Sequence, residues 1–196
     1  GFIRQLVYIS TTGVYGDHRG AKVSEATPVN PQSERAQRRV DAERVLRLWG
    51  PAHGVAITIL RVPGIYALDR LPIERLQSKT PALLPEEDAY SNHIHSDDLA
   101  RLVCAAVYHG KPQRVMNACD GSETKMGDYF DEVANAFGID KSPRMPASEL
   151  QKLVSPMLWS FMRESRRVTN ARLHELKTPL HYPSVADFLK TISKNP

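Results

Sequence analysis

Short apolar runs alternate with amphipathic stretches in the first third of the chain. Two runs, Leu6–Ser10 and Ala56–Val62, are short, continuous and rich in β-branched residues, which is typical of strands buried on both faces of a parallel sheet. Between them, residues 33–49 place apolar side chains at three- and four-residue spacings. This spacing predicts a helix that Ser33 caps and that ends at Gly50-Pro51. Strand, helix and strand in this order predict a βαβ unit.

The rest of the chain predicts further short elements. They are a helix over 97–108, a strand over 114–118, a helix over 124–137 closed by Gly138, a helical region over 147–163 interrupted at Pro156, and short helices near 169–176 and 184–193. Residues 68–91 contain three prolines and are expected to be irregular. The fold class expected from this order is α/β with a doubly wound parallel sheet.

Composition excludes several classes of protein. A hydrophobic share of 41% with 24% charged residues is that of a globular protein, and no apolar run is long enough for a transmembrane helix. The net charge of +4 is too small to indicate nucleic acid as a partner. Cys104 and Cys119 lie far apart, which favours free thiols in a reducing cytoplasm. His93 and His95 are expected to have a structural role at a helix start, and no metal site is expected.

Four stretches occur in the order and spacing of a known family. They are Val7-Tyr8-Ile9-Ser10-Thr11-Thr12-Gly13-Val14-Tyr15-Gly16, Leu60-Arg61-Val62-Pro63-Gly64-Ile65-Tyr66, Asn92-His93-Ile94-His95-Ser96-Asp97-Asp98-Leu99-Ala100 and Asn117-Ala118-Cys119-Asp120-Gly121. Together they resemble the extended short-chain dehydrogenase/reductases, the NAD-dependent epimerases and dehydratases of nucleotide sugars. The tail resembles the atypical branch of that family.

The resemblance implies a Rossmann-type sheet and a nicotinamide cofactor, NAD or NADP. Residues 1–110 would be the remaining back half of the cofactor-binding core, with residues 68–91 as a cap insertion. Residues 111–196 would form a smaller, mixed α/β substrate-binding subdomain. The family's Gly-x-x-Gly-x-x-Gly loop, which binds the pyrophosphate, is absent from the sequence. We therefore expect that the front half was removed or that the protein exists as a fragment with an exposed sheet edge.

The resemblance also assigns candidate site residues. The cofactor-binding candidates are Ser10, Thr11, Arg39, Pro63, Gly64 and Ile65; the substrate-binding candidates are Arg70 and Asn92; the catalytic candidates are Thr11, Tyr15 and Arg35. Several alternatives remain open at this point. Thr11 could instead satisfy backbone groups at a strand end, and Tyr15 could be a packed turn aromatic. Residues 63–65 could form only a tight turn, and Arg70 could be a solvated loop arginine.

The resemblance places two arginines where the family has its catalytic Tyr-x-x-x-Lys pair. Arg35 occupies the position of its Tyr and Arg39 that of its Lys. A guanidinium stays protonated and accepts no hydrogen bond, so Arg35 cannot exchange a proton as a phenol does. The sequence thus leaves two hypotheses, an NAD(P)-dependent epimerase/dehydratase-like oxidoreductase with a hydroxyl-bearing small-molecule substrate of the nucleotide-sugar kind, and a non-catalytic NAD(P)-binding sensor or partner-binding protein.

The arginine-rich helix over residues 33–49 has three interpretations. The helix could be solvated or face a second copy in a dimer, it could contact a phosphate through Arg39, or it could bind nucleic acid. Family members pair through this element, so the first interpretation implies a homodimer through residues 33–49.

Overall fold

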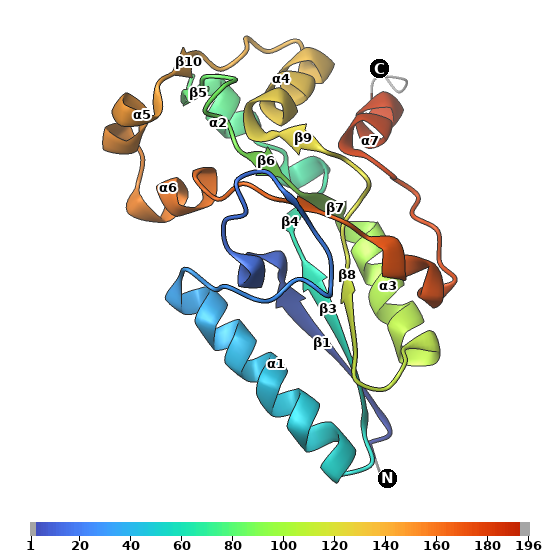
Figure 1. Ribbon diagram of the computed structural model, residues 1–196. Helices are drawn as coiled ribbons and strands as arrows, with labels where there is room; N and C mark the ends of the chain where they lie inside the picture. Colours follow the sequence, from blue (N-terminus) through green and yellow to red (C-terminus); the bar gives the residue numbers. More distant parts are fainter. Residues whose placement is uncertain (1–2, 193–196) are drawn as a thin grey trace.

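The computed structural model describes residues 3–192 and centres on a three-stranded parallel sheet. The strand order is β1 (Gln5–Thr11), β3 (Ala56–Val62), β8 (Arg114–Asn117). β1 and β3 pair over their whole length, so the two predicted buried strands are confirmed and end side by side (Figure 1). Because β8 pairs with β3, the sheet extends past residue 110.

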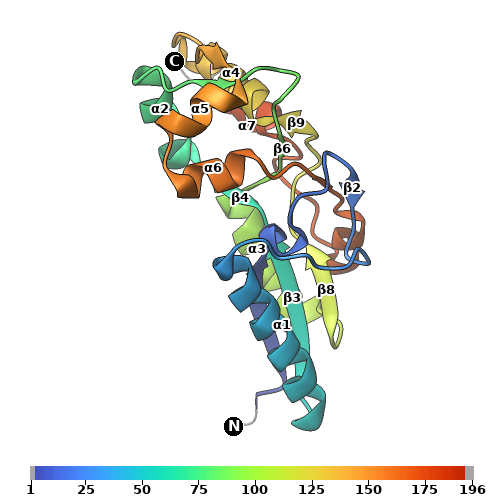
Figure 2. The same ribbon diagram turned by 60° about the vertical axis from the view of Figure 1, so that its left-hand side comes forward.

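One helix covers each face of this sheet. α1 (Glu34–Ala52) packs through Leu46 on a cluster that contains Ile57 and Ile59 of β3. α3 (Ser96–His109) packs on the other face, where Leu60 and Val62 lie in a core cluster with Leu102 of this helix (Figures 1 and 2). Alternate side chains of one strand therefore enter two cores, which explains the continuous apolar run in β3. The predicted α/β fold is confirmed.

The other elements mostly gather beyond the carboxyl ends of the strands, whereas η3 (Ala171–Leu176) packs beside β8 and α3 (Figure 1). In chain order they are η1 (Thr12–Tyr15), β2 (Lys22–Val23), β4 (Gly64–Tyr66), η2 (Leu68–Arg70), α2 (Ile73–Gln77), β5 (Ala82–Leu83), β6 (Tyr90–Ser91), β7 (His93–His95), β9 (Thr124–Lys125), α4 (Met126–Phe137), β10 (Arg144–Met145), α5 (Ala147–Leu153), α6 (Pro156–Met162), β11 (Arg167–Val168), η3 (Ala171–Leu176) and α7 (Val185–Ile192). A second core joins α4 and α7 to Tyr66 of β4 and Leu76 of α2.

The expectation of irregular chain over residues 68–91 is wrong. This segment contains η2, α2, β5 and β6. β5 pairs with β10 and β6 pairs with β9, so each of these two-residue strands depends on a distant partner. No local periodicity can reveal such strands.

The region near 169–176 is a 3-10 helix, and residue 193 of the predicted last helix lies outside the described residues.

The predicted end of the arginine-rich helix at Gly50-Pro51 is also wrong, because α1 continues to Ala52. Gly54, in the left-handed conformation at φ 66°, follows its end. Gly50 has another role. A Cβ atom at this position would lie 2.4 Å from Ile57 Cγ1 and 2.8 Å from the Val55 carbonyl oxygen. The missing side chain lets α1 approach β3 closely.

A buried ion pair joins α1 to the sheet. Arg61 of β3 donates from Nε to Glu43 Oε1 at 3.1 Å and from Nη2 to Glu43 Oε2 at 2.7 Å, and each side chain is 5% exposed. Ser10 of β1 donates to the same carboxylate. The Arg61 guanidinium also lies 4.9 Å from the centre of the Tyr15 ring. This pair therefore connects two strands, α1 and η1.

Within the described residues, β1 pairs on one side only. Ile9 in this strand is 43% exposed, as an uncovered edge strand would leave it. In residues 3–192 no helix has both the length and the apolar character needed to cross a membrane.

We expect Gly50→Ala to destabilise the protein, although alanine is the better helix former. The added Cβ would overlap Ile57 and the Val55 backbone, and overpacking of this kind costs about 1–3 kcal/mol. Urea unfolding would measure the change. Arg44→Ala on an exposed part of the same helix is the matched control, expected within about 0.5 kcal/mol of the parent. A Gly50→Ala variant more stable than the parent would contradict the close approach.

We expect Glu43→Ala to lower the free energy of unfolding by about 3–5 kcal/mol, because it leaves the buried Arg61 charge without its carboxylate. Thermal or urea unfolding would measure this loss. Glu34→Ala removes an exposed partner of Arg38 from the same helix and should cost less than about 1 kcal/mol. Equal losses in the two variants would show that the buried pair does not hold α1 to the sheet.

Candidate functional site

A cleft of about 700 Å³ opens at the carboxyl ends of β1 and β3. Its walls come from both strand ends, the start of α1, the β4 and β7 segments, and α6 with the residues after it. In open α/β sheets this end of the strands is where ligands bind. The cleft brings together nine of the ten predicted site residues: Ser10, Thr11, Arg35, Arg39, Pro63, Gly64, Ile65, Arg70 and Asn92.

Thr11 lies at the junction of β1 and η1. Its Oγ1 accepts a hydrogen bond from the Gly13 N–H at 3.1 Å and so caps η1. The residue is half-buried and lines the cleft. Both interpretations of Thr11 therefore fit its position, because a hydroxyl can satisfy a backbone donor and still face a ligand. The neighbouring Ser10 hydroxyl, by contrast, is buried and committed to Glu43.

Two arginines on the first turns of α1 border the cleft. The Arg35 guanidinium lies 4.6 Å from the centre of the Phe161 ring, which links α1 to α6 across the opening. Arg39 donates from Nη1 to Tyr8 Oη at 3.0 Å and to the Ile9 carbonyl at 3.3 Å. These contacts hold two exposed cations beside the end of β1.

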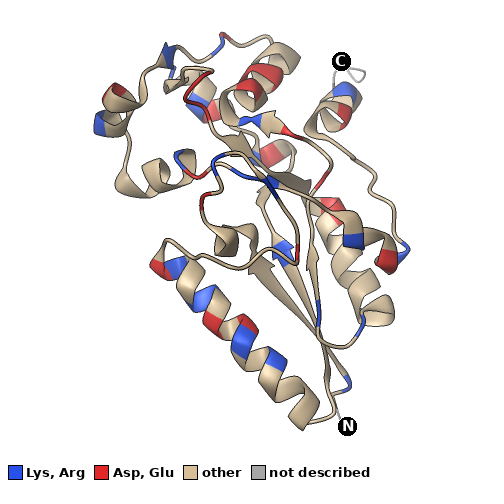
Figure 3. Ribbon diagram, viewed as in Figure 1, with Lys and Arg blue, Asp and Glu red and all other residues tan. Residues whose placement is uncertain are grey.

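Basic and acidic residues are both distributed along α1 (Figure 3). Val45 and Leu48 are exposed between them. Pairing of two copies through this helix stays a prediction.

The opposite wall is formed by β4 and the residues before β7. The Gly64 N–H donates to the Asn92 carbonyl at 3.1 Å. The Asn92 side chain donates to the Arg166 carbonyl at 3.0 Å and accepts from the Val168 N–H at 2.8 Å. Asn92 therefore holds the β11 segment against the cleft. Arg70 is exposed at the rim.

Tyr15 does not reach the cleft. Its side chain is fully buried, and its hydroxyl donates to Asn117 Oδ1 at 2.8 Å. Burial raises the pKa of this hydroxyl. The 3-10 turn η1 rotates the side chain into a small core with Val14 and Val23. The structure therefore gives Tyr15 the packed-turn role rather than the catalytic one.

Sequence analysis missed two groups around the cleft. The first is the Arg61–Glu43 pair beneath Ser10; an arginine inside an otherwise apolar strand was the available signal, since a buried charge needs a partner. The second is His93, which was expected to be structural but lines the cleft.

His93 lies beside unusual polar groups. The buried atoms without a hydrogen-bond partner in the described residues include His93 Nδ1, Tyr66 Oη and Asp120 Oδ2. Burial lowers the pKa of His93 to about 4 and raises that of Asp120 to about 7. The Asp120 N–H donates to the His93 carbonyl at 2.8 Å, which fixes the two residues side by side.

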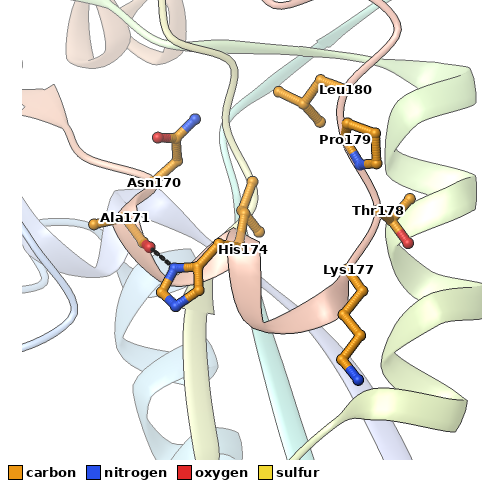
Figure 4. Close-up of a pocket in the computed structure, with 8 residues that line it drawn as sticks. Asn170, Ala171, His174, Lys177, Thr178, Pro179 and Leu180 are labelled. Carbon is orange, nitrogen blue, oxygen red and sulfur yellow. Dashed lines mark hydrogen bonds between the residues drawn. The ribbon is translucent and has the colours of Figure 1, made fainter.

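A second hollow of about 500 Å³ lies beside η3, between Asn170 and Leu180 (Figure 4). Its lining is mostly apolar, and its one histidine, His174, contacts the Ala171 carbonyl through Nδ1. The residues that line it include no acid and no cysteine, so it offers less chemistry than the cleft. Residues 3–192 contain no cluster of three or more side chains suited to a metal ion.

We expect Asp120→Asn to change how stability depends on pH. A carboxyl whose pKa rises on folding stabilises the native state below its unfolded pKa of about 3.9, and that advantage is lost as pH rises towards 7. The free energy of unfolding of the variant, relative to that of the parent, should therefore rise by about 1.4 kcal/mol per pH unit between pH 4 and pH 7. The asparagine can still accept from the Ser122 N–H as Asp120 Oδ1 does.

Urea unfolding of both proteins at several pH values would measure this difference. The parent's own profile is less informative, because His93 with its lowered pKa gives the opposite slope between about pH 4 and pH 6.5. A difference between variant and parent that stays constant with pH would contradict a protonated Asp120.

Comparison with known proteins identifies the family. The family model described as NAD dependent epimerase/dehydratase family matches residues 2–119. A solved structure of a functionally unknown conserved protein from Silicibacter pomeroyi is 31% identical, with a TM-score of 0.83 over 98% of this chain and 67% of that one. RMD from Pseudomonas aeruginosa, complexed with NADPH, shares the fold at 18% identity, with a TM-score of 0.73 over 99% of this chain and 66% of that one.

A curated relative is the trifunctional UDP-glucose 4,6-dehydratase/UDP-4-keto-6-deoxy-D-glucose 3,5-epimerase/UDP-4-keto-L-rhamnose-reductase of Arabidopsis thaliana. It is 26% identical over an alignment of 152 residues, and the match covers 71% of this chain. The chain spans 23% of the length of that relative. With the family model matched over more than half of its residues, the chain belongs to the NAD-dependent epimerase/dehydratase family.

Proposed function

We propose that this chain forms the substrate side of an NAD(P)-dependent oxidoreductase that acts on a hydroxyl-bearing substrate of the nucleotide-sugar kind. The observation that carries the proposal is that nine of the ten residues assigned by the family resemblance line one cleft. These residues come from separate segments of the sequence and converge only through the fold.

The cleft walls suit the nicotinamide end of a dinucleotide. Gly64 is exposed on the cleft wall and has no side chain to keep a ligand away from its backbone. Thr11 and Arg39 supply a hydroxyl and a cation on the facing wall, for ribose or phosphate oxygens. A bound dinucleotide would accept or deliver hydride at this place. The pyrophosphate has no glycine-rich loop to bind it in this sequence.

The charges at the cleft suit a phosphorylated substrate. Arg35, Arg70 and Arg166 line it, whereas Glu164 is the one lining acid and is paired with Arg166 at 2.8 Å. Diphosphate groups attract such arginines through charge-assisted hydrogen bonds. The curated relative named for UDP-sugar reactions supports the same substrate class.

Arg35 also supports a second candidate function, a dinucleotide-binding protein without turnover. The family's proton-exchanging phenol is absent from this position, and Tyr15 is too deeply buried to replace it. A panel of carbonyl and alcohol compounds with NADH, NADPH, NAD and NADP would separate the two functions. Conversion of any compound supports the oxidoreductase, and dinucleotide binding without conversion of any supports the binding protein.

We expect the chain to bind NADH or NADPH saturably, with Arg39→Met weakening the affinity about 10- to 150-fold. Methionine keeps the apolar stem and removes a charge-assisted contact worth about 1.5–3 kcal/mol. Titration followed by nicotinamide fluorescence would measure both affinities. Arg38→Met, one residue away but paired with the exposed Glu34, is the matched control and should bind like the parent.

Equal affinity of the parent and Arg39→Met would reject the role of Arg39. Absence of binding by this chain, with binding once natural upstream residues are added, would place an essential part of the dinucleotide site outside the sequence. Absence of binding in both would reject the proposed function.

A further inference from the structure

Besides Thr11, whose hydroxyl can still face a ligand, few side chains of the cleft are available to hold an uncharged oxygen. Its arginines are permanent cations, better matched to phosphates. Ser10 is committed to Glu43, and both polar atoms of the Asn92 side chain hold the β11 segment. The Ser33 hydroxyl caps α1. The hydroxyls of Ser91 and Ser160 donate to the Thr124 and Met157 carbonyls. Among the ionisable groups other than arginine, Tyr90, His93 and Glu164 remain.

Tyr90 and Glu164 are directed to other contacts. The Tyr90 ring lies within 3.3 Å of the Cβ position of Gly20, 5.2 Å from the Arg167 guanidinium and 5.9 Å from Lys125 Nζ. None of these three neighbours lines the cleft. Glu164 accepts from Arg166 and could not donate to an oxygen as a carboxylate.

His93 has the geometry of a fixed donor. Its ring packs 4.3 Å from the Tyr129 ring and 6.2 Å from the Tyr66 ring, measured between centroids. The edge that carries Cδ2 and Nε2 faces Gly64, whose Cβ position would lie 3.4 Å from Cδ2 and 4.0 Å from Nε2. Gly64 itself lines the cleft, so this edge of the imidazole forms part of the wall.

The buried side of the ring decides which nitrogen carries the proton. Nδ1 is enclosed and has no partner in the described structure. The titratable groups around it are Tyr66 from β4, Tyr129 from α4 and Asp120 after β8. Burial raises the pKa of each of these three groups, so each keeps its proton near neutral pH more readily than usual. A proton on the enclosed Nδ1 would be a buried donor without an acceptor, so the neutral ring carries its proton on Nε2, on the edge that faces Gly64.

We propose that His93 is the neutral hydrogen-bond donor of the cleft and offers its Nε2–H to an uncharged carbonyl or hydroxyl oxygen of the bound ligand. This inference rests on the proposed function and adds a recognition residue to it. A preorganised donor of this kind orients a carbonyl and stabilises negative charge on its oxygen. Two sources of that oxygen are compatible with the cleft, the carboxamide of the nicotinamide and the substrate.

The first test is nitrogen-15 NMR of the histidine side chains in the uniformly labelled chain, with His93 assigned from the spectrum of His93→Gln. We expect a protonated Nε2 and an unprotonated Nδ1 at pH 7, unchanged down to pH 5. A proton on Nδ1, or an imidazolium at pH 6, would overturn the proposal. This measurement needs no ligand, so it decides the donor state whether or not a dinucleotide binds.

The second test adds NADPH alone and then NADPH with UDP-glucose as the probe substrate. A shift of the Nε2 resonance with NADPH alone assigns the oxygen to the carboxamide, and a shift only with both assigns it to the substrate. Binding seen by nicotinamide fluorescence without any shift of Nε2 would overturn the proposal while leaving the proposed function intact.

Variants give an independent measure. His93→Phe keeps a ring between the two tyrosines but removes the donor. It should weaken, by about three- to tenfold, the binding of the ligand whose addition shifts the Nε2 resonance. His93→Gln retains an amide donor and should keep most of the parent's affinity for that ligand. Urea unfolding of both variants checks that they are folded. Equal affinity of His93→Phe and the parent would also overturn the proposal.

Discussion

The buried Arg61–Glu43 pair is the interaction on which the cleft depends. Two charges removed from water are tolerated only with close geometry and further hydrogen bonds, and both are present here, because Ser10 donates to the same carboxylate. The pair fixes both the rotation of α1 about its own axis and its position along that axis, relative to β1 and β3. Arg35 and Arg39 lie one to two turns before Glu43 on the same helix, so their position beside Thr11 follows from this contact.

The opposite wall has a different origin. Short strands from distant segments, β4 with β7 and β6 with β9, attach the cap to the ends of the sheet. These strands have few hydrogen bonds of their own, and Tyr66 anchors β4 in the second core, which also contains Tyr129. That core also encloses one side of His93. The packing of the cap thus sets both the width of the cleft and the protonation state of a residue that lines it.

The sequence predicted the sheet well and the site in part. β3 was found with its bounds because burial on both faces leaves a continuous apolar run, and Thr11 and Gly64 follow directly from strand ends. Tyr15 was misplaced because a single 3-10 turn decides which way its side chain points. Gly50 was interpreted as a helix end because its true role, contact with Ile57, is non-local. His93 and Asp120 were missed because burial, which shifts their pKa values in opposite directions, is a property of the packed structure.

The chemistry of the cleft is richer in binding groups than in groups that exchange protons. Arg35 places a permanent charge where relatives with the Tyr-x-x-x-Lys pair hold a titratable phenol, and its stacking on Phe161 ties that charge to α6. A cation there strengthens attraction for phosphates but supplies no proton. A neutral imidazole on the facing wall would complement it, since one wall then recognises charge and the other an uncharged oxygen. Specificity in such a cleft arises from the difference between its two walls.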